Sequence, residues 1–474
     1  MKKIRRNFVF TYCIIFLVAI ALLLPVCFAA FAIFLPPVYD ETFPGELKYK
    51  VERLENTEGK RIIIIGGSSV AFGINSALIE QYTQGYSVVN FGMYASLGTK
   101  VMLDIAEKNI RRGDIIILSP EQNEQTLSLY FGTETFWQCA DGALSLYGYL
   151  KSSEKERALG GFAQFAVDKF RYNSEGTILQ PSDIYRRDSF NEYGDIKPGL
   201  RANNIMFGGW DANTPVSLSP TVFSEEFTDY VNSFNEKVTS SGATLYYRFC
   251  PMNKSAVIGD IEDCYNALDS VLDCRIIGNP EESSMDREWF YDTNFHLNDS
   301  GVILNTRNII RDIKTQLFDS TPTDIEIPEK PSLGNVQGSG DNSDSGLFTY
   351  ESRENGVIIT GLTEAGLTAE EIIVPYSVEQ GIVAGFEANV FAGNTVIKRI
   401  TLQDNIRFIY DRSFDGCTAL ERITIKTRVP NTISVGNALL EGTDATIYVP
   451  REAYATFVTN YTWAQYHSRI AASD

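Results

Sequence analysis

Short apolar runs that end in a small or polar residue recur between residues 60 and 280. Most are rich in β-branched residues, and stretches with helical spacing, such as Thr99–Arg111, lie between the early ones. The runs are RIIIIG (Arg61–Gly66), SVVNFG (Ser87–Gly92), DIIILSP (Asp114–Pro120), ATLYYRF (Ala243–Phe249) and CRIIG (Cys274–Gly278). This alternation predicts an α/β domain with a parallel sheet covered by helices on both faces. Residues 124–224 interrupt it and are predicted to be a partly helical insertion rich in aromatic residues.

Another apolar pattern lies at the N-terminus, where MKKIRR precedes an uncharged run from Asn7 to Tyr39. About 20 apolar residues span a bilayer, whereas the apolar part of a cleavable signal peptide has only about 7–15. We therefore expect residues 1–37 to form a basic cytoplasmic tip and a transmembrane helix. An Ala-x-Ala triplet at Ala30 and Ala32 leaves late cleavage open. The cationic flank predicts a single-pass cell-membrane protein with its N-terminus inside and its body extracellular.

The C-terminal part repeats with a fixed period. Residues 319–346 are rich in Pro, Gly, Ser and Asp and predict a disordered linker before a separate domain, residues 347–474. In that domain, apolar residues recur 23 positions apart, which predicts a solenoid of stacked units. The equivalent pairs are Phe391 and Phe414, Ile397 and Leu420, Ile400 and Ile423, and Leu402 and Ile425.

The phrases RSFDGCTALERITI and ATIYVPREAYATFVTNYTWAQY resemble the BspA-type leucine-rich repeats of bacterial surface proteins. The resemblance covers roughly Ile372–Ile470 and implies a β-rich leucine-rich-repeat solenoid that binds a protein or surface ligand. A small unrelated β domain that happens to repeat once is the alternative.

Charge and cysteine content narrow the function classes. The formal net charge is −19, although four cations lie in the first six residues, so the body is strongly acidic. Nucleic-acid binding needs a basic face, so we expect no nucleic-acid partner. The seven cysteines form no CxxC pair. Isolated thiols are expected, with a disulfide among Cys250, Cys264 and Cys274 left open. No phosphate-binding glycine loop or HExxH motif occurs, so no metal or organic cofactor is predicted.

Serine and histidine provide the candidate chemistry. His296 and His467 are the only histidines, and His296 precedes a helical stretch in FYDTNFHLNDSG. Imidazole is the usual general base for a serine nucleophile near neutral pH. In IIIIGGSSVAFGIN, Ser68 lies at a glycine turn between a strand and a helix, with Ser69 as the alternative in the next register. These serines could also merely cap the helix.

These phrases resemble the conserved blocks of SGNH (GDSL-type) hydrolases, including anchored envelope acyl-transfer proteins of the DltD and AlgX kind. Gly66 and Ser68 match the Gly-x-Ser turn, and the phrase from His296 to Gly301 matches HxNxxG. The resemblance implies a flavodoxin-like three-layer domain at residues 45–318, with Ser68 as nucleophile and His296 as base. The family aspartate lies three residues before the histidine, but here Asp292 lies four before it. Asp292 is the expected third member, with Asp286 and Asp299 as weaker candidates.

An acyl-transfer site also needs donors for the developing oxyanion. Asn90-Phe91-Gly92 matches the second SGNH block, so the resemblance implies the backbone N–H groups of Ser68 and Gly92 as donors. The GxND phrase of the third block is missing, and SPEQN stands after the third strand instead. Asn123 or Gln122 is the candidate for the third donor, which could also be absent.

The expected function is an extracellular, membrane-anchored serine esterase or O-acyltransferase that acts on an acylated envelope glycan or another ester. The alternative is a non-catalytic surface-binding or adhesion protein that uses the repeats, with the SGNH-like domain as a degenerate scaffold.

Overall fold

The computed structural model describes residues 11–12, 14–18, 23, 27, 30, 32–176, 179, 184–201, 205–206, 210–211, 214–322, 324–332, 340–353, 356–428, 430–436, 438–459, 463 and 466–473. Much of the predicted anchor, including Phe31 of the Ala-x-Ala triplet, lies outside these residues. Within them, no helix has both the length and the apolar character needed to cross a membrane. Separate apolar clusters form in the N-terminal region, residues 43–318, and in the C-terminal region, residues 340–473.

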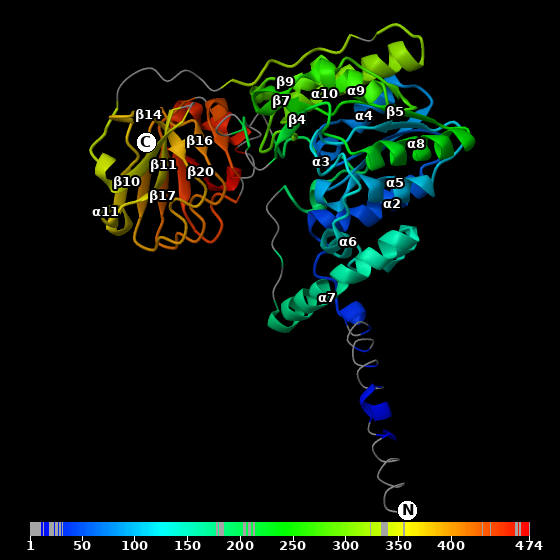
Figure 1. The fold of residues 1–474 in the computed structure, drawn as a ribbon. Coiled ribbons are helices and arrows are strands. Elements are labelled where there is room, and N and C mark those ends of the chain that lie inside the picture. Colours follow the sequence, from blue (N-terminus) through cyan, green and yellow to red (C-terminus); the bar gives the residue numbers. More distant parts are fainter. Residues whose placement is uncertain are drawn as a thin grey trace, which may run out of the picture.

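The N-terminal region is built on a parallel five-stranded sheet (Figure 1). The strand order is β2-β1-β3-β5-β8, which places the first strand in the interior of the sheet. The strands are β1 (Lys60–Gly66), β2 (Tyr86–Gly92), β3 (Ile115–Leu118), β5 (Thr244–Tyr247) and β8 (Arg275–Ile276). The prediction of a parallel α/β sheet is therefore confirmed. In a sheet of this order, the chain reverses its winding direction between β1 and β3, and ligands bind at such a switch point.

Helices cover both faces of this sheet because alternate side chains of each strand point to opposite sides. Ile62 and Ile64 pack in one cluster with Ile309 of α10, whereas Ile63 and Ile65 pack in another with Leu103 of α5. The helices are α2 (Leu47–Asn56), α3 (Ser68–Ala71), α4 (Ser76–Tyr82), α5 (Thr99–Glu107), α8 (Glu225–Ser240), α9 (Ile261–Asp269) and α10 (Asp299–Asp312).

The stretch predicted to be an insertion, residues 124–224, contributes α6 (Thr133–Cys139), α7 (Ser152–Glu175) and β4 (Val216–Leu218). Trp137 is buried and lies against the rings of Phe136, Tyr147, Phe162 and Phe165. These aromatic residues therefore form part of the core. Strand β4 pairs with β7 (Val257–Gly259), and β6 (Met252–Asn253) pairs with β9 (Ser284–Met285).

The C-terminal region consists of two sheets that enclose one apolar core (Figure 1). The first has the order β12-β15-β17-β19-β20, and all its strands are parallel. Its strands are β12 (Glu371–Ile373), β15 (Arg399–Leu402), β17 (Arg422–Ile425), β19 (Thr446–Val449) and β20 (Ile470–Ala472).

The register of this sheet shows the predicted repeat. Ile400 pairs with Ile423, Leu402 pairs with Ile425, and the rings of Phe391 and Phe414 stack with centroids 5.2 Å apart. Residues 23 positions apart therefore occupy equivalent places in successive units.

The second sheet begins with an antiparallel pair, β10 (Phe348–Arg353) and β11 (Gly356–Leu362). Parallel strands β14 (Gly381–Phe386), β16 (Phe408–Ile409) and β18 (Ser434–Val435) continue it, and the short β13 (Ser377–Val378) pairs with β14. Helices α11 (Glu364–Thr368) and α12 (Tyr454–Thr459) complete this region.

The stretch predicted to be a linker, residues 319–346, is bonded to the rest of the chain at both ends, and its middle, residues 333–339, lies outside the described residues. On the N-terminal side, Arg307 Nε donates to Ile325 O at 3.1 Å. On the C-terminal side, the Asp341 backbone exchanges two hydrogen bonds with the Gln403 side chain, and Asp344 Oδ2 accepts from Ile373 N–H at 2.7 Å. By these contacts, the C-terminal region starts before residue 347.

We predict that these bonds stabilise the repeats measurably. A fragment of residues 340–474 should unfold cooperatively in urea, and a fragment of residues 347–474 should be less stable by about 1–3 kcal/mol because buried Gln403 loses its two hydrogen bonds to Asp341. In the longer fragment, Asp344→Ala should give an intermediate value, and the exposed Glu379→Ala should change stability by less than about 0.5 kcal/mol. Equal stability of the two fragments would contradict the prediction.

Candidate functional site

The candidate site lies at the carboxyl edge of the sheet, where β1 and β3 end side by side. Ile65 pairs with Leu118, and Ser119 N–H donates to Ile65 O at 2.7 Å. Immediately after β1, the chain turns at Gly66 and Gly67 and enters α3 at Ser68. A Cβ on Gly66 would lie 2.3 Å from Ser119 O, so this tight turn requires glycine.

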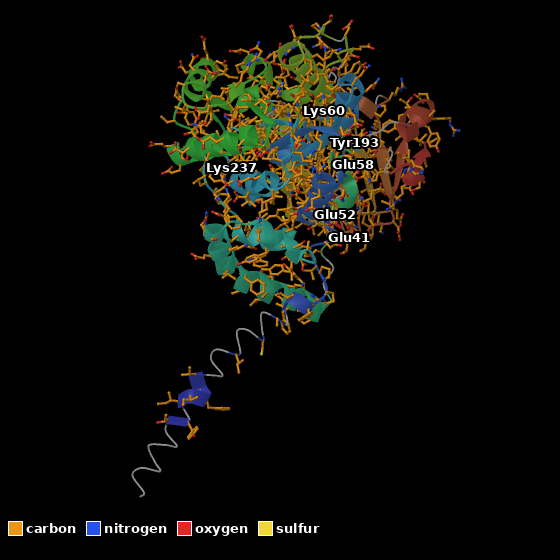
Figure 2. All side chains as sticks on the ribbon, turned by 90° about the vertical axis from the view of Figure 1, so that its right-hand side faces the viewer. Glu41, Glu52, Glu58, Lys60, Tyr193 and Lys237 are labelled. Atoms are coloured by element: carbon orange, nitrogen blue, oxygen red, sulfur yellow. The ribbon has the colours of Figure 1, made fainter. Side chains whose placement is uncertain are left out.

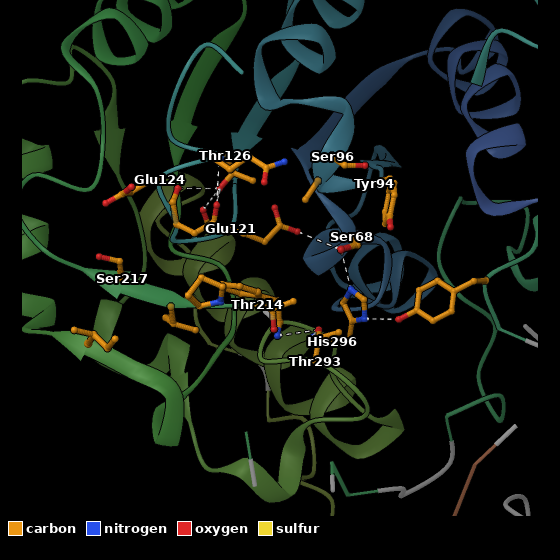
Figure 3. Close-up of a pocket in the computed structure, with 18 residues that line it drawn as sticks. Ser68, Tyr94, Ser96, Glu121, Glu124, Thr126, Thr214, Ser217, Thr293 and His296 are labelled. Carbon is orange, nitrogen blue, oxygen red and sulfur yellow. Dashed lines mark hydrogen bonds between the residues drawn. The ribbon is translucent and has the colours of Figure 1, made fainter. Parts of the chain in front are cut away.

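Ser68, His296 and Asp292 form one hydrogen-bonded chain (Figure 3 shows the first two). Ser68 Oγ lies 2.7 Å from His296 Nε2, and His296 Nδ1 lies 2.8 Å from Asp292 Oδ1. Ser68 and His296 are buried, at 7% and 5% exposed. With Nδ1 protonated and held by the carboxylate, Nε2 is free to accept the proton of Ser68 Oγ.

The local turn explains how Asp292 reaches the ring from four residues away. Tyr291 N–H donates to His296 O at 2.8 Å, which closes the loop that contains the extra residue. Thr293, at the usual family position, uses its Oγ1 to accept from His296 N–H at 3.2 Å. The weaker candidates are engaged elsewhere: Asp286 pairs with Lys330 and Asp299 with Arg201.

Two aromatic residues that the sequence analysis did not single out hold the histidine in place. The Phe72 ring stacks on the His296 ring, with centroids 4.0 Å apart and planes inclined by 8°. Tyr185, which belongs to the insertion, donates its hydroxyl to Asp292 Oδ2 and lies 3.1 Å from His296 Nδ1. Burial and the Asp292 charge raise the pKa of Tyr185 well above its ordinary value, so its hydroxyl remains a donor.

The predicted oxyanion donors differ in their availability. At the first position of α3, the Ser68 N–H has no acceptor among the described residues. The Gly92 N–H, in contrast, donates to Asn90 Oδ1 at 2.9 Å. Asn123 lines the site; its Oδ1 accepts from Thr126 N–H at 3.0 Å, which leaves the Nδ2 group as its donor. Gln122 Nε2 points inward to Tyr247 OH at 2.8 Å. Of the predicted donors, the Ser68 N–H and the Asn123 Nδ2 group are therefore not engaged by other described residues.

Glu121 occupies the place next to the serine where the sequence analysis sought an amide. Its Oε1 accepts from Ser69 N–H at 2.8 Å and lies 3.5 Å from Ser68 Oγ, whereas its Oε2 has no partner among the described residues. The side chain is 2% exposed. Burial raises the pKa of this carboxyl above its ordinary value, although the Ser69 N–H and the nearby imidazole act in the opposite direction.

A cavity of about 780 Å³ opens onto these residues (Figure 3). Its size suits a ligand larger than a single small ester. Many of the lining side chains are hydroxyls and amides, and an apolar wall completes it. The polar lining includes Ser96, Gln125, Thr126, Thr214, Ser217 and Thr293, and the apolar wall includes Val216, Ile258 and Phe295.

Other candidate chemistry is not assembled within the described residues. No cluster of three or more His, Cys, Asp or Glu side chains there could hold a metal ion. Cys250, Cys264 and Cys274 are free, buried thiols. His467 is exposed in the terminal repeat unit and does not line the cavity, whereas His296 does.

The arrangement provides a nucleophile, a base and an orienting carboxylate beside a large cavity. The glycine turn and the histidine phrase allowed these three to be selected from the sequence. The sequence also offered a way to find Glu121, since this residue directly follows Ser119-Pro120 at the end of the strand next to β1. No sequence pattern indicated Tyr185, because its contact with Asp292 depends on the path of the insertion.

Comparisons with known proteins give a partial structural likeness only. No family model and no curated protein matches the chain. A leucine-rich repeat protein of T. pallidum matches 17% of this chain and 41% of its own, with 24% identity and a TM-score of 0.15. A leucine-rich repeat protein from Bacteroides capillosus matches 22% of this chain and 94% of its own, with 18% identity and a TM-score of 0.18. This chain thus spans less than half of the first of these structures.

Proposed function

We propose that the N-terminal region is an SGNH-type serine hydrolase that acts as an esterase or O-acyltransferase. The observation that carries the proposal is the hydrogen-bonded chain from Ser68 through His296 to Asp292, of which Ser68 and His296 line the cavity. The three residues belong to two phrases more than two hundred positions apart, as the serine–histidine separation of 228 shows. Their convergence supports a common chemical role over independent capping and surface roles.

In the proposed reaction, His296 Nε2 takes the proton from Ser68 Oγ as this oxygen attacks the ester carbonyl. The carbonyl oxygen becomes an oxyanion beside the Ser68 N–H, and Asp292 stabilises the imidazolium. Collapse of the intermediate breaks the bond to the leaving alkoxide, which receives the proton from His296. Water or a sugar hydroxyl then releases the acyl group from Ser68 by the same steps in reverse.

The cavity sets hydroxyl and amide side chains beside apolar surface, and we propose an acylated envelope glycan or extracellular ester as its substrate class. Sugars offer many hydroxyl groups, which the serine, threonine and glutamine side chains of the lining can meet with hydrogen bonds. No metal or organic cofactor enters this mechanism.

A surface-binding protein without catalysis is the second candidate, because the Gly92 N–H is already engaged by Asn90 and a carboxyl group lies beside Ser68. In that case, the C-terminal repeats would bind a protein or surface ligand and the α/β region would be a scaffold. Activity measurements separate the two candidates.

We predict that the full-length protein hydrolyses p-nitrophenyl acetate and is labelled by a fluorophosphonate serine probe. Ser68→Ala and His296→Ala should each lower kcat at least about 10³-fold, and the double variant should be no worse than either, because the pair acts as one unit. Ser69→Ala should retain most activity. If Ser69→Ala were the inactive variant, the nucleophile would be the wrong serine; if wild type neither reacted nor was labelled, the scaffold candidate would stand.

The orienting groups should matter less than the base. Asp292→Asn should reduce kcat by less than His296→Ala does, and Tyr185→Phe should reduce it about tenfold because Asp292 loses one donated hydrogen bond. Asp292→Asn should keep KM within about threefold, since Asp292 does not line the cavity. A Tyr185→Phe variant with unchanged kcat would show that the hydroxyl does not position Asp292.

The proposed location is the outer face of a membrane, with the N-terminus inside, because MKKIRR precedes the apolar run. External protease on intact cells should then degrade the body of the protein. Protection of the body until the cells are lysed would contradict this topology.

A further inference from the structure

The site as the sequence analysis drew it has lost one of its expected oxyanion donors. Acyl-transfer sites usually aim more than one donor at the developing charge, and the loss of one costs about 10²–10³-fold in kcat. Here the Ser68 N–H is available and Asn123 lines the cavity, but the Gly92 N–H is bonded to Asn90. A group that can donate a hydrogen bond close to the Ser68 turn would replace the Gly92 donor.

The Glu121 side chain lies against that turn. A Cβ on Gly67 would lie 2.1 Å from Oε2 and 2.3 Å from Oε1 of Glu121, so both oxygens lie directly against the backbone that carries the Ser68 N–H. In addition, Oε1 lies 3.5 Å from Ser68 Oγ (Figure 3). The absence of a side chain at Gly67 is what allows the carboxyl to approach so closely.

The ionisation state of Glu121 decides what it can do there. An ionised carboxylate accepts hydrogen bonds only, and its charge would repel an oxyanion formed on the carbonyl attacked by Ser68. A neutral carboxyl accepts from Ser69 N–H through one oxygen and donates through the other. Oε2 has no partner among the described residues, so it can carry the proton while Oε1 keeps its bond to Ser69.

We propose that Glu121 is a catalytic residue that acts in its neutral form and donates its O–H to the oxyanion, in place of an amide. This proposal rests on the acyl-transfer function proposed above. During attack, the Ser68 proton moves to His296 Nε2, the new bond forms between Ser68 Oγ and the carbonyl carbon, and the carbonyl π pair moves to oxygen. Glu121 keeps its proton throughout and only shares it in a hydrogen bond. The burial of Glu121, which raises its pKa, supports this role.

The pH dependence of kcat/KM for p-nitrophenyl acetate tests the proposal in the full-length chain. Wild type should lose activity at high pH as Glu121 ionises, because an ionised carboxylate cannot donate a hydrogen bond. Glu121→Gln keeps a donor that does not titrate, so it should stay within about tenfold of wild type at the optimum and should lose the alkaline limb. Glu121→Ala should lower kcat about 10²–10³-fold across the whole pH range.

Glu58→Gln is the matched control, because Glu58 is exposed and lies just before β1, at the opposite edge of the sheet from the cavity (Figure 2 labels it near Lys60). It should reproduce the wild-type profile. The proposal is overturned if Glu121→Gln keeps the wild-type alkaline limb, or if it is as inactive as Glu121→Ala while both unfold at wild-type temperatures. An inactive, unlabelled wild type would instead remove the proposed function itself.

A measurement without substrate tests the charge state independently. Because the folded-state pKa of Glu121 is raised, the folded protein binds this proton more tightly than the unfolded chain, and ionisation destabilises the fold as pH rises above the ordinary glutamate value of about 4.3. Glu121→Gln lacks this loss, so its Tm relative to wild type should increase from pH 4 towards neutral pH, as it should not for Glu58→Gln. A Tm difference that does not change with pH would overturn the neutral form.

Discussion

The parallel pairing of β1 with β3 is the constraint on which the candidate site depends. Hydrogen bonds in this pairing place Ile65 beside Leu118, so the chain leaves both strands at the same edge and at the same height. Ser68 and Glu121 are separated by 53 positions in the sequence, yet they meet because each lies three residues beyond its strand's paired end. The remaining parts of the site are then brought to this edge: His296 just before α10, and Tyr185 from the insertion.

The parallel sheet and the repeat stack could be predicted from the sequence because both rest on local periodicity. β-branched runs indicate buried strands, and the 23-residue period fixes which residues of successive units pair, as Ile400 and Ile423 do. The path of residues 124–224 could not be predicted, because its helices are held by aromatic contacts such as those of Trp137 rather than by a periodic pattern. The boundary between the linker and the C-terminal region could not be predicted either, since Asp341 and Asp344 form hydrogen bonds with residues distant in sequence, Gln403 and Ile373.

In the candidate site, short sequence motifs predicted the residues whose positions depend on local chain geometry. The glycine turn and HxNxxG selected Ser68 and His296, and a loop longer by one residue still brings Asp292 to the ring. The oxyanion donors could not be assigned in this way, because availability depends on competing partners. Gly92 shows this: its N–H is engaged by the side chain of Asn90, only two positions away. Glu121 was overlooked because a carboxylate is usually counted as an acceptor, whereas burial raises the pKa of this carboxyl.

The far ends of β1 and β3 carry a buried ion pair, in which Arg61 Nε lies 3.0 Å from Asp114 Oδ1. Arg61 is fully buried and also bonds to the carbonyl oxygens of Leu54 and Asn109, so the pair cannot follow a strand that slips by one residue. A slip would also exchange the two faces of the strand. Deletion of a single residue within either strand should thus separate Ser68 from Glu121, whereas replacement of the side chain that follows β3 leaves the frame untouched. The β1–β3 pairing and its ion pair thus fix the backbone position of residue 121, so the side chain at that position can be exchanged without a change in the sheet.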